Sequence, residues 1–235
     1  MSGIDFLCVG AHADDIEISM GGTVAKMVAL GRMGLLVDVT DASMGTRGTP
    51  EERLHEASEA ARIVGIGRRN LGFPDGSLRP LDADLVRELG ALFRELRPNT
   101  VFTHPTVDRH PDHEAVASCV REAAFKAGLV RWTAPGDAWR PRRVFHWMGA
   151  RDGEPTFCVD VTEHWETRLR ALAAYRSQFG TEGTPTALSD ERFPDFLRSR
   201  ARFLGSRARC RYAEGFTCEE LPEVADPCAL SGEDF

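Results

Sequence analysis

The chain of 235 residues contains almost no lysine: apart from Lys26 and Lys126, all of its 29 basic residues are arginine. The 36 acidic residues outnumber the basic ones, and a net charge of −7 with a pI near 5.5 argues against nucleic acid as the main partner. No apolar run approaches the ~18 residues of a membrane-spanning helix. The N-terminus lacks the basic region and the apolar run of a signal peptide. We therefore expect a soluble, cytoplasmic protein with no membrane partner.

The cysteines are few and scattered, without a CxxC pair, at Cys8, Cys119, Cys158, Cys210, Cys218 and Cys228. This spacing disfavours a disulfide framework and a cysteine zinc site, so we expect free thiols. GxGxxG and P-loop patterns are also missing, and carboxylates follow the first strand where a dinucleotide would place its phosphates. Dinucleotide and nucleotide triphosphate binding are therefore disfavoured.

Segments of strand and helix character alternate along the chain. Apolar runs typical of strands occupy residues 6–9, 35–40, 70–73, 100–103, 144–148, 157–160 and 211–216. Apolar residues at helical spacing occupy 21–33, 51–64, 84–96, 114–126, 162–179 and 196–204. This alternation predicts an α/β fold in which helices cover both faces of a mostly parallel sheet. No repeat or linker interrupts it, so we expect a single domain over residues 1–235, with a loosely ordered tail from about residue 221.

Three polar side chains follow the first expected strand: His12, Asp14 and Asp15. The sequence Gly21-Gly22-Thr23 then predicts the start of a helix. Ligands of open α/β sheets bind beyond the carboxyl ends of the strands, which is where these side chains should lie. An imidazole and two carboxylates within four residues suit a divalent metal together with a general base.

A second cluster, Asp108-Arg109-His110-Pro111-Asp112-His113, follows the expected strand at residues 100–103. Pro111 suits the first turn of a helix, because a backbone N–H at that position would have no hydrogen-bond partner within the helix. His110 and His113 are then three residues apart at a helix start, close enough to serve one site. We expect this cluster at the same edge of the sheet as His12.

The two clusters together predict a catalytic centre. His12, Asp15 and His113 would form a site of two histidines and one carboxylate that leaves positions open for water and substrate. Asp14 would remain free as the general base that accepts a proton from the attacking water.

Other side chains of the same edge have predicted supporting roles. A protonated His110 could stabilise the developing oxyanion and protonate the leaving amine, with Asp112 holding that imidazole in its charged form. Arg53 and Arg109 are candidates to grip a substrate carboxylate or phosphate through their planar guanidinium groups.

The segments AHADDIEISMGGT and DRHPDHEAV resemble the signatures of the LmbE/PIG-L metal-dependent N-acetylglucosamine deacetylases. Further segments, among them NLGFPDGSL and the residues around Tyr212-Ala213-Glu214-Gly215-Phe216, resemble the bacillithiol-pathway branch, so that the resemblance extends from Ile4 to about Phe216. The resemblance implies a Rossmann-like three-layer α/β/α fold of the LmbE type and a hexamer. It also implies zinc-dependent removal of acetyl from N-acetylglucosaminyl-malate, a small-molecule conjugate of N-acetylglucosamine (GlcNAc).

Carried over by motif, the resemblance assigns the same roles. His12, Asp15 and His113 would bind zinc, with Fe²⁺ as the alternative metal in the cell, and Asp14 would be the base. His110 would be the electrostatic catalyst with Asp112 behind it, and Arg53 and Arg109 would contact substrate.

The chain departs from the family pattern at two positions. Ala13 replaces the usual proline of AHPDD, and Phe193 stands where relatives can place a mobile tyrosine. Alternatives within the class are a deacetylase or amidase for another conjugate, inositol-linked or a chito-oligosaccharide. Outside it stand a non-haem Fe(II) enzyme, disfavoured by the βα alternation, and a sugar-binding protein without catalysis, disfavoured by the intact acid/base set.

Overall fold

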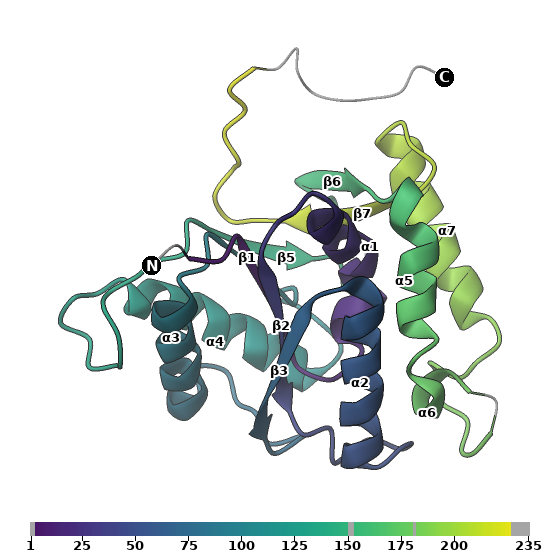
Figure 1. Ribbon diagram of the computed structural model, residues 1–235, viewed down its shortest axis with the longest axis horizontal. Helices are drawn as coiled ribbons and strands as arrows, with labels where there is room; N and C mark the ends of the chain where they lie inside the picture. Colours follow the sequence, from purple (N-terminus) through teal and green to yellow (C-terminus); the bar gives the residue numbers. More distant parts are fainter. Residues whose placement is uncertain (1–2, 150–152, 181, 227–235) are drawn as a thin grey trace.

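The computed structural model describes residues 3–149, 153–180 and 182–226, and its centre is one mixed sheet (Figure 1). The strands run in the spatial order β3-β2-β1-β4-β5-β7-β6. Their bounds are β1 (Phe6–Gly10), β2 (Gly34–Thr40), β3 (Gly67–Phe73), β4 (Thr100–Thr103), β5 (Arg143–Trp147), β6 (Phe157–Asp160) and β7 (Ala213–Thr217). The strands from β3 to β5 pair in parallel, whereas β7 is antiparallel to both of its neighbours. The sheet is therefore mostly parallel, as the sequence predicted.

Helices cover both faces of this sheet (Figure 1). They are α1 (Asp15–Ala29), α2 (Pro50–Val64), α3 (Ala83–Leu96), α4 (Pro111–Ala127), the short 3₁₀ turn η1 (Thr162–His164), α5 (Trp165–Leu172), α6 (Arg176–Phe179) and α7 (Phe193–Arg207). One core lies between the sheet and α3 and α4, and another lies between the sheet and α1 and α2. The predicted three-layer α/β/α fold is confirmed. Over the described residues, no helix is long and apolar enough to cross a membrane.

The central strand β1 supplies both cores. Leu7 and Val9 face the α3 and α4 side, and Phe6 and Cys8 face the α1 and α2 side, all of them 2% exposed or less. Successive side chains of a strand point to opposite faces, so a parallel strand covered on both sides must be apolar throughout. The apolar run therefore ends where the chain leaves the sheet, and His12 follows at its edge.

The first helix begins earlier than the sequence predicted. It starts at Asp15, and Met20 has non-helical dihedral angles (φ −145°, ψ 24°) that separate it into two segments. The carboxylate of Glu214, on β7, accepts the N–H groups of Gly22 (3.0 Å) and Thr23 (2.7 Å). Because a helix start leaves such N–H groups without partners, Glu214 acts as an N-cap from another element. The glycine pair thus opens the second segment, and the sequence missed the first.

The single helix predicted over residues 162–179 is wrong, because the chain breaks into η1, α5 and α6. Tyr175 has non-helical dihedral angles (φ −82°, ψ 65°) and a fully buried side chain. The N–H of Ser177 donates to Glu56 of α2 at 2.7 Å. Packing against α2 therefore outweighs the helical pattern here. Of the predicted loose tail, residues 221–226 are described and mostly exposed, and the rest, with Cys228, lies outside the described residues.

Candidate metal centre

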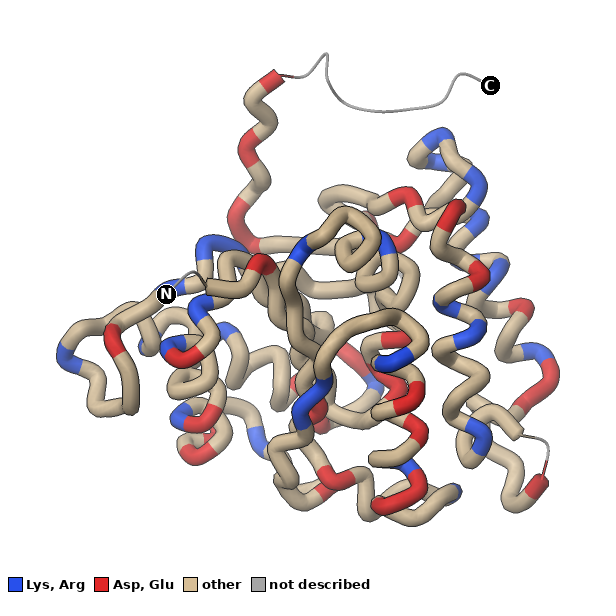
Figure 2. The backbone as a smooth tube through the Cα atoms, in the orientation of Figure 1, with Lys and Arg blue, Asp and Glu red and all other residues tan. Residues whose placement is uncertain are grey.

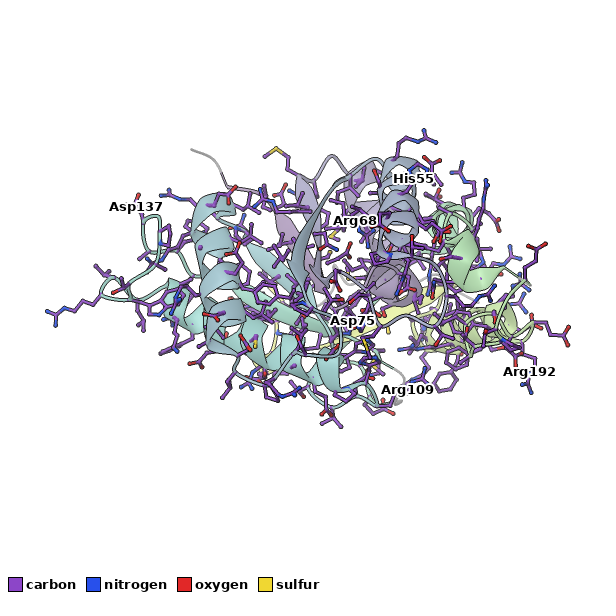
Figure 3. The ribbon with its side chains drawn as sticks, turned by 90° about the horizontal axis from the view of Figure 1, so that it is seen from below. His55, Arg68, Asp75, Arg109, Asp137 and Arg192 are labelled. Carbon is purple, nitrogen blue, oxygen red and sulfur yellow. The ribbon has the colours of Figure 1, made fainter. Side chains whose placement is uncertain are left out.

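The side chains predicted to form the site lie at the carboxyl edge of the sheet, beyond β1 and β4. These two strands are neighbours, and the order of the sheet reverses between them, with β2 on one side and β5 on the other. A cavity of about 680 Å³ opens at this edge. Figure 3 views the molecule from below, and Asp75 and Arg109 appear there at this end of the sheet. Such a reversal is where open α/β sheets bind ligands.

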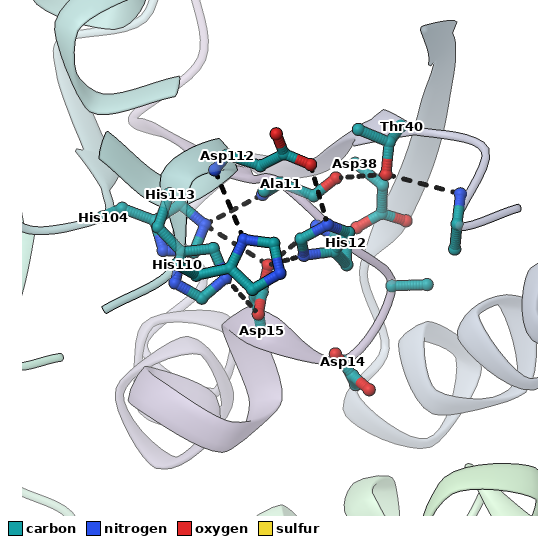
Figure 4. A network of polar contacts seen from close by, with 12 residues as sticks. Ala11, His12, Asp14, Asp15, Asp38, Thr40, His104, His110, Asp112 and His113 are labelled. Atoms are coloured by element: carbon teal, nitrogen blue, oxygen red, sulfur yellow. Dashed lines mark hydrogen bonds and ion pairs between the residues drawn. The ribbon is translucent and has the colours of Figure 1, made fainter. Parts of the chain in front are cut away.

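The three residues predicted as metal ligands come together at this point (Figure 4). The donor atoms of His12, Asp15 and His113 all lie within 4.8 Å of one another. Asp15 Oδ2 is 3.3 Å from His12 Nδ1, and Asp15 Oδ1 is 3.3 Å from His113 Nε2. Two imidazoles and one carboxylate match the ligands of a catalytic zinc or iron site and leave further positions open. The donor set therefore fits a divalent transition metal, and its use as a metal site stays a prediction.

Two acidic residues to which the sequence assigned no role orient the imidazoles from behind. Asp75 Oδ1 lies 3.0 Å from His12 Nε2, and Asp108 Oδ1 lies 3.4 Å from His113 Nδ1. Each imidazole thus turns one nitrogen towards Asp15 and the other towards a second carboxylate. This is the arrangement by which ligand histidines are held in one tautomer and made better donors. The position of Asp75 shortly after β3 is the signal that could have marked it.

His104, also missed, is a buried wall of the site. Its ring stacks on that of His113, with centroids 3.9 Å apart and planes 20° apart. Its Nε2 accepts the N–H of Ala11 at 2.9 Å, so this nitrogen carries no proton and its approach to Asp15 is no hydrogen bond. Burial, helped by the charge of His113, lowers the pKa of His104 to about 4. A neutral ring therefore packs against the candidate ligands, and the position after β4 was the signal that could have found it.

The site is strongly charged, and its groups stabilise one another. Burial lowers the pKa of His113, but the nearby carboxylates of Asp15 and Asp108 outweigh burial and raise it to about 9. The pKa of His12 is likewise raised against the effect of burial, by Asp112, Asp15 and Asp75. Because ligand imidazoles must be neutral, metal binding at these residues must compete with protons.

Asp14 lines the same cavity in an unusual backbone conformation. Its φ of 119° is rare for a residue with a side chain, and such strain is typical of functional sites. Arg53 Nη2 donates to Ala13 O at 2.7 Å and to Asp14 Oδ2 at 3.1 Å. Burial raises the pKa of Asp14 to about 7, with Arg53 opposing that rise and Asp15 adding to it. A carboxylate near neutrality is well matched to general base catalysis.

Arg53, a predicted substrate contact, also lines the cavity, but its side chain is 6% exposed and its Nη2 is bonded to Ala13 O and Asp14 Oδ2. A contact of Arg53 with substrate stays a prediction. Since the pairing joins residues 39 positions apart, no local pattern could have indicated it. Arg109, the other predicted substrate contact, is exposed and lines the cavity.

His110 and Asp112 are both at the site, but their contacts differ from those predicted. His110 is the N-cap of α4, and its Nδ1 accepts the N–H of Asp112 at 3.3 Å. The Asp112 carboxylate instead accepts the N–H of Gly76 at 3.0 Å and lies 3.4 Å from His12 Nε2. Burial and the neighbouring imidazoles of His12 and His113 lower the pKa of His110. A neutral ring whose Nδ1 accepts carries its proton on Nε2, which leaves that N–H as a donor.

The donor atoms of His12, His110 and Asp112 also lie within 4.8 Å of one another, and form a second possible ligand group. His110, however, is exposed, whereas His12 and Asp15 are buried. We therefore favour the group of His12, Asp15 and His113, whose imidazoles also have the carboxylates Asp75 and Asp108 behind them.

Phe193 lines the cavity, begins α7 and stacks on Phe179 with ring centroids 5.7 Å apart. Neither of the two tyrosines of the chain, Tyr175 and Tyr212, is among the described residues that line the cavity. That Phe193 replaces a catalytic tyrosine stays a prediction.

The site combines a cluster of imidazoles and carboxylates at the switch point of the sheet with a buried carboxylate of near-neutral pKa. This combination is typical of a metal-dependent hydrolase. The chain belongs to the PIG-L family: the family model described as GlcNAc-PI de-N-acetylase matches residues 7–124, half of the sequence. The resemblance found in the two motifs is thereby confirmed.

Relatives and a solved structure extend the similarity beyond the matched segment. The diacetylchitobiose deacetylase of Thermococcus kodakarensis is 28% identical over 89% of this chain and 80% of its own length. The probable N-acetyl-alpha-D-glucosaminyl L-malate deacetylase 2 of Bacillus cereus is 29% identical over 73% of this chain and 82% of its own. The crystal structure of protein TT1542 from Thermus thermophilus superposes with a TM-score of 0.87 and 34% identity, covering 94% of this chain and 97% of the other.

Proposed function

We propose that this protein is a metal-dependent hydrolase that removes the acetyl group from a conjugate of N-acetylglucosamine. The observation that carries the proposal is the presence, in one cavity, of a three-residue donor set and of Asp14, a separate base. Membership of the PIG-L family supports the acyl group and the sugar. The cavity, about 680 Å³, is of the size that holds small molecules.

His12, Asp15 and His113 would hold the metal, zinc in the first instance and Fe²⁺ as the alternative. A divalent metal supplies a Lewis acid that polarises the amide carbonyl and makes water easier to deprotonate. Asp14 takes the proton of the attacking water as the new C–O bond forms. Arg53 holds the carboxylate of Asp14 in place for this step, through the 3.1 Å contact.

Negative charge then develops on the former carbonyl oxygen. The Nε2–H of His110 is the protein donor we assign to that oxygen. The lowered pKa of His110 favours the neutral ring in this role over the protonated imidazole that the sequence predicted. When the C–N bond breaks, the proton held by Asp14 passes to the leaving nitrogen. The products are acetate and the free amine of the glucosamine conjugate.

Among such conjugates we propose N-acetylglucosaminyl-malate. The motifs resemble the bacillithiol branch, and the Bacillus cereus relative is named for that activity. Arg109 is an exposed arginine that lines the cavity and can receive a malate carboxylate, whereas Arg53 is engaged with Asp14. The diacetylchitobiose and inositol-linked conjugates named for other relatives are the alternatives.

A panel assay tests both levels of the proposal. Metal-loaded protein is incubated with GlcNAc-malate, GlcNAc-inositol, diacetylchitobiose and GlcNAc, and the freed amine is measured. We expect release from GlcNAc-malate with the highest kcat/KM, and a rise in its KM in Arg109→Ala that GlcNAc does not show. Release from another conjugate alone would overturn the malate assignment, and no release from any would overturn the deacetylase.

A further inference from the structure

A second cavity, of about 400 Å³, lies behind the metal centre, between α4, the start of β5 and the segment after β7. Two buried histidines separate the two cavities: His146 lines the second, and His104 lines the first. His146 Nδ1–H donates to the carbonyl oxygen of His104 at 2.6 Å. The second cavity is therefore a distinct site that shares one wall with the candidate active site.

Arginine dominates the rim of this cavity. Its four guanidinium groups come from α4 and from the chain entering β5, and belong to Arg121, Arg140, Arg142 and Arg143. Glu122 also lines the cavity, but its carboxylate is paired with Lys126 at 2.9 Å. Clustered guanidinium groups are the preferred protein partners of carboxylate and phosphate oxygens, which they bind in pairs of hydrogen bonds.

The carboxylates that meet these arginines belong to the segment after β7. Because β7 runs antiparallel to β5, with His146 opposite Thr217, the chain beyond Thr217 passes the start of β5. Arg121 Nε is 2.7 Å from Glu219, and Arg143 Nη1 is 3.4 Å from Glu220. Figure 2 shows acidic positions on this segment next to basic positions at the start of β5. Arg140 Nη2 also donates to Phe125 O at 3.1 Å. Because four arginines but only two of these carboxylates line the cavity, positive charge is in excess there.

These two ion pairs are open to exchange. The side chains of Glu219 and Glu220 are 59% and 82% exposed, and those of their partners are 47% and 37% exposed. Ion pairs at such exposure contribute little to stability, since water competes for both partners. A dissolved anion with several oxygens can therefore take the place of the two carboxylates at small cost.

We propose that this cavity binds a small multivalent oxyanion, such as sulfate or a dicarboxylate, in competition with Glu219 and Glu220. Its volume limits the ligand to a small molecule, and its excess of arginine selects for more than one negative charge. Glu219 and Glu220 compete with the anion for the arginines and thereby lower the affinity of the cavity for it.

Isothermal titration calorimetry of the metal-loaded protein with sulfate and with succinate, at ionic strength matched with sodium chloride, tests this site. We expect both anions to bind the wild type. The double variant Arg121→Ala/Arg143→Ala should bind at least tenfold more weakly. The double variant Glu219→Gln/Glu220→Gln lacks both competing ion pairs. It should bind the anions more tightly than the wild type, by about twofold to fivefold for each ion pair removed.

Arg198→Ala is the matched control, because Arg198 is a half-exposed arginine that pairs with Asp195 on α7 and does not line the cavity. It should bind both anions as the wild type does. The site would be overturned if a double variant Arg121→Ala/Arg143→Ala with native circular dichroism bound the anions as tightly as the wild type. It would also be overturned if Arg198→Ala lost as much affinity as the double variant, or if neither anion bound to the wild type. Binding of one anion class alone identifies that class as the ligand.

Discussion

Arg53 Nη2 contacts both the side chain of the strained residue Asp14 and the backbone just before it, at 3.1 Å from Asp14 Oδ2 and 2.7 Å from Ala13 O. A φ of 119° at Asp14 costs free energy that the surrounding contacts must offset. Arg53 supplies such contacts and also opposes the rise in the pKa of Asp14 that burial causes. It is thus a positioning residue for the proposed base.

The first prediction concerns Arg53→Ala. Loss of the guanidinium should misplace Asp14 and move the acidic limb of the kcat profile to higher pH, because Arg53 lowers the pKa of Asp14. We expect kcat to fall about tenfold to a hundredfold, within the value of general base catalysis, while bound metal is retained. Steady-state kinetics across pH measure this. A rise in KM for anionic substrates alone, with kcat unchanged, would contradict this prediction and show that Arg53 contacts substrate.

The second prediction concerns His110. If its Nε2–H receives charge in the transition state, His110→Ala should keep its metal and lose about 10²–10³ in kcat, the range for one oxyanion donor. His110→Asn, which keeps a polar N-cap for α4, is the control for helix stability. Wild-type turnover in the alanine variant would exclude this role.

The third prediction concerns the carboxylate behind a candidate ligand. Asp108→Asn should weaken metal binding about 10-fold to 100-fold, because Asp108 lies 3.4 Å from His113 Nδ1 and orients that ring. Asp137→Asn, at an exposed ion pair with Arg97, is the matched control and should leave metal affinity unchanged. Competition with a chelating dye gives the affinities. Equal affinities in wild type and Asp108→Asn would remove Asp108 from the site.

The fourth prediction follows from the raised pKa of His113, about 9 against an ordinary value of about 6.5. A histidine whose pKa is raised by folding stabilises the native state below its unfolded pKa, and that contribution is lost as pH rises through the folded value. The metal-free protein should therefore lose stability between about pH 6.5 and pH 9, and metal loading should protect it increasingly over that range. Thermal unfolding of chelator-treated and metal-loaded protein measures the gap in Tm. A gap that narrows as pH rises would contradict the proposed ligands.

Local patterns predicted much of this molecule. The apolar run of β1 and the proline at the start of α4 were enough to predict that His12 and His113 lie at one edge of the sheet. What could not be predicted were partners brought by tertiary structure. Asp75 meets His12 across 63 positions, and Glu214 caps Gly22 across 192. The position after a strand can mark Asp75 as a candidate, but no sequence pattern identifies His12 as its partner or Gly22 as the partner of Glu214.

The roles of individual side chains were the hardest to predict. Arg53 and Asp112 were both expected near the predicted site, and both lie there. Arg53 bonds to Asp14, and the carboxylate of Asp112 lies beside His12 and not beside His110 as predicted. Spacing brings residues to one edge, whereas side-chain packing decides which of them pair. The single domain, the hexamer and the cytoplasmic location remain predictions from the sequence.

The central claim, that His12, Asp15 and His113 hold a catalytic metal while Asp14 serves as the base, is tested most directly by measuring bound metal and turnover in the same samples. Elemental analysis and kcat are determined for wild type, His113→Ala and Asp14→Asn. We predict that His113→Ala loses both metal and activity, whereas Asp14→Asn keeps a full equivalent of metal and loses about 10²–10⁴ in kcat. Full metal retained in His113→Ala, or near-normal turnover in Asp14→Asn, would contradict the account.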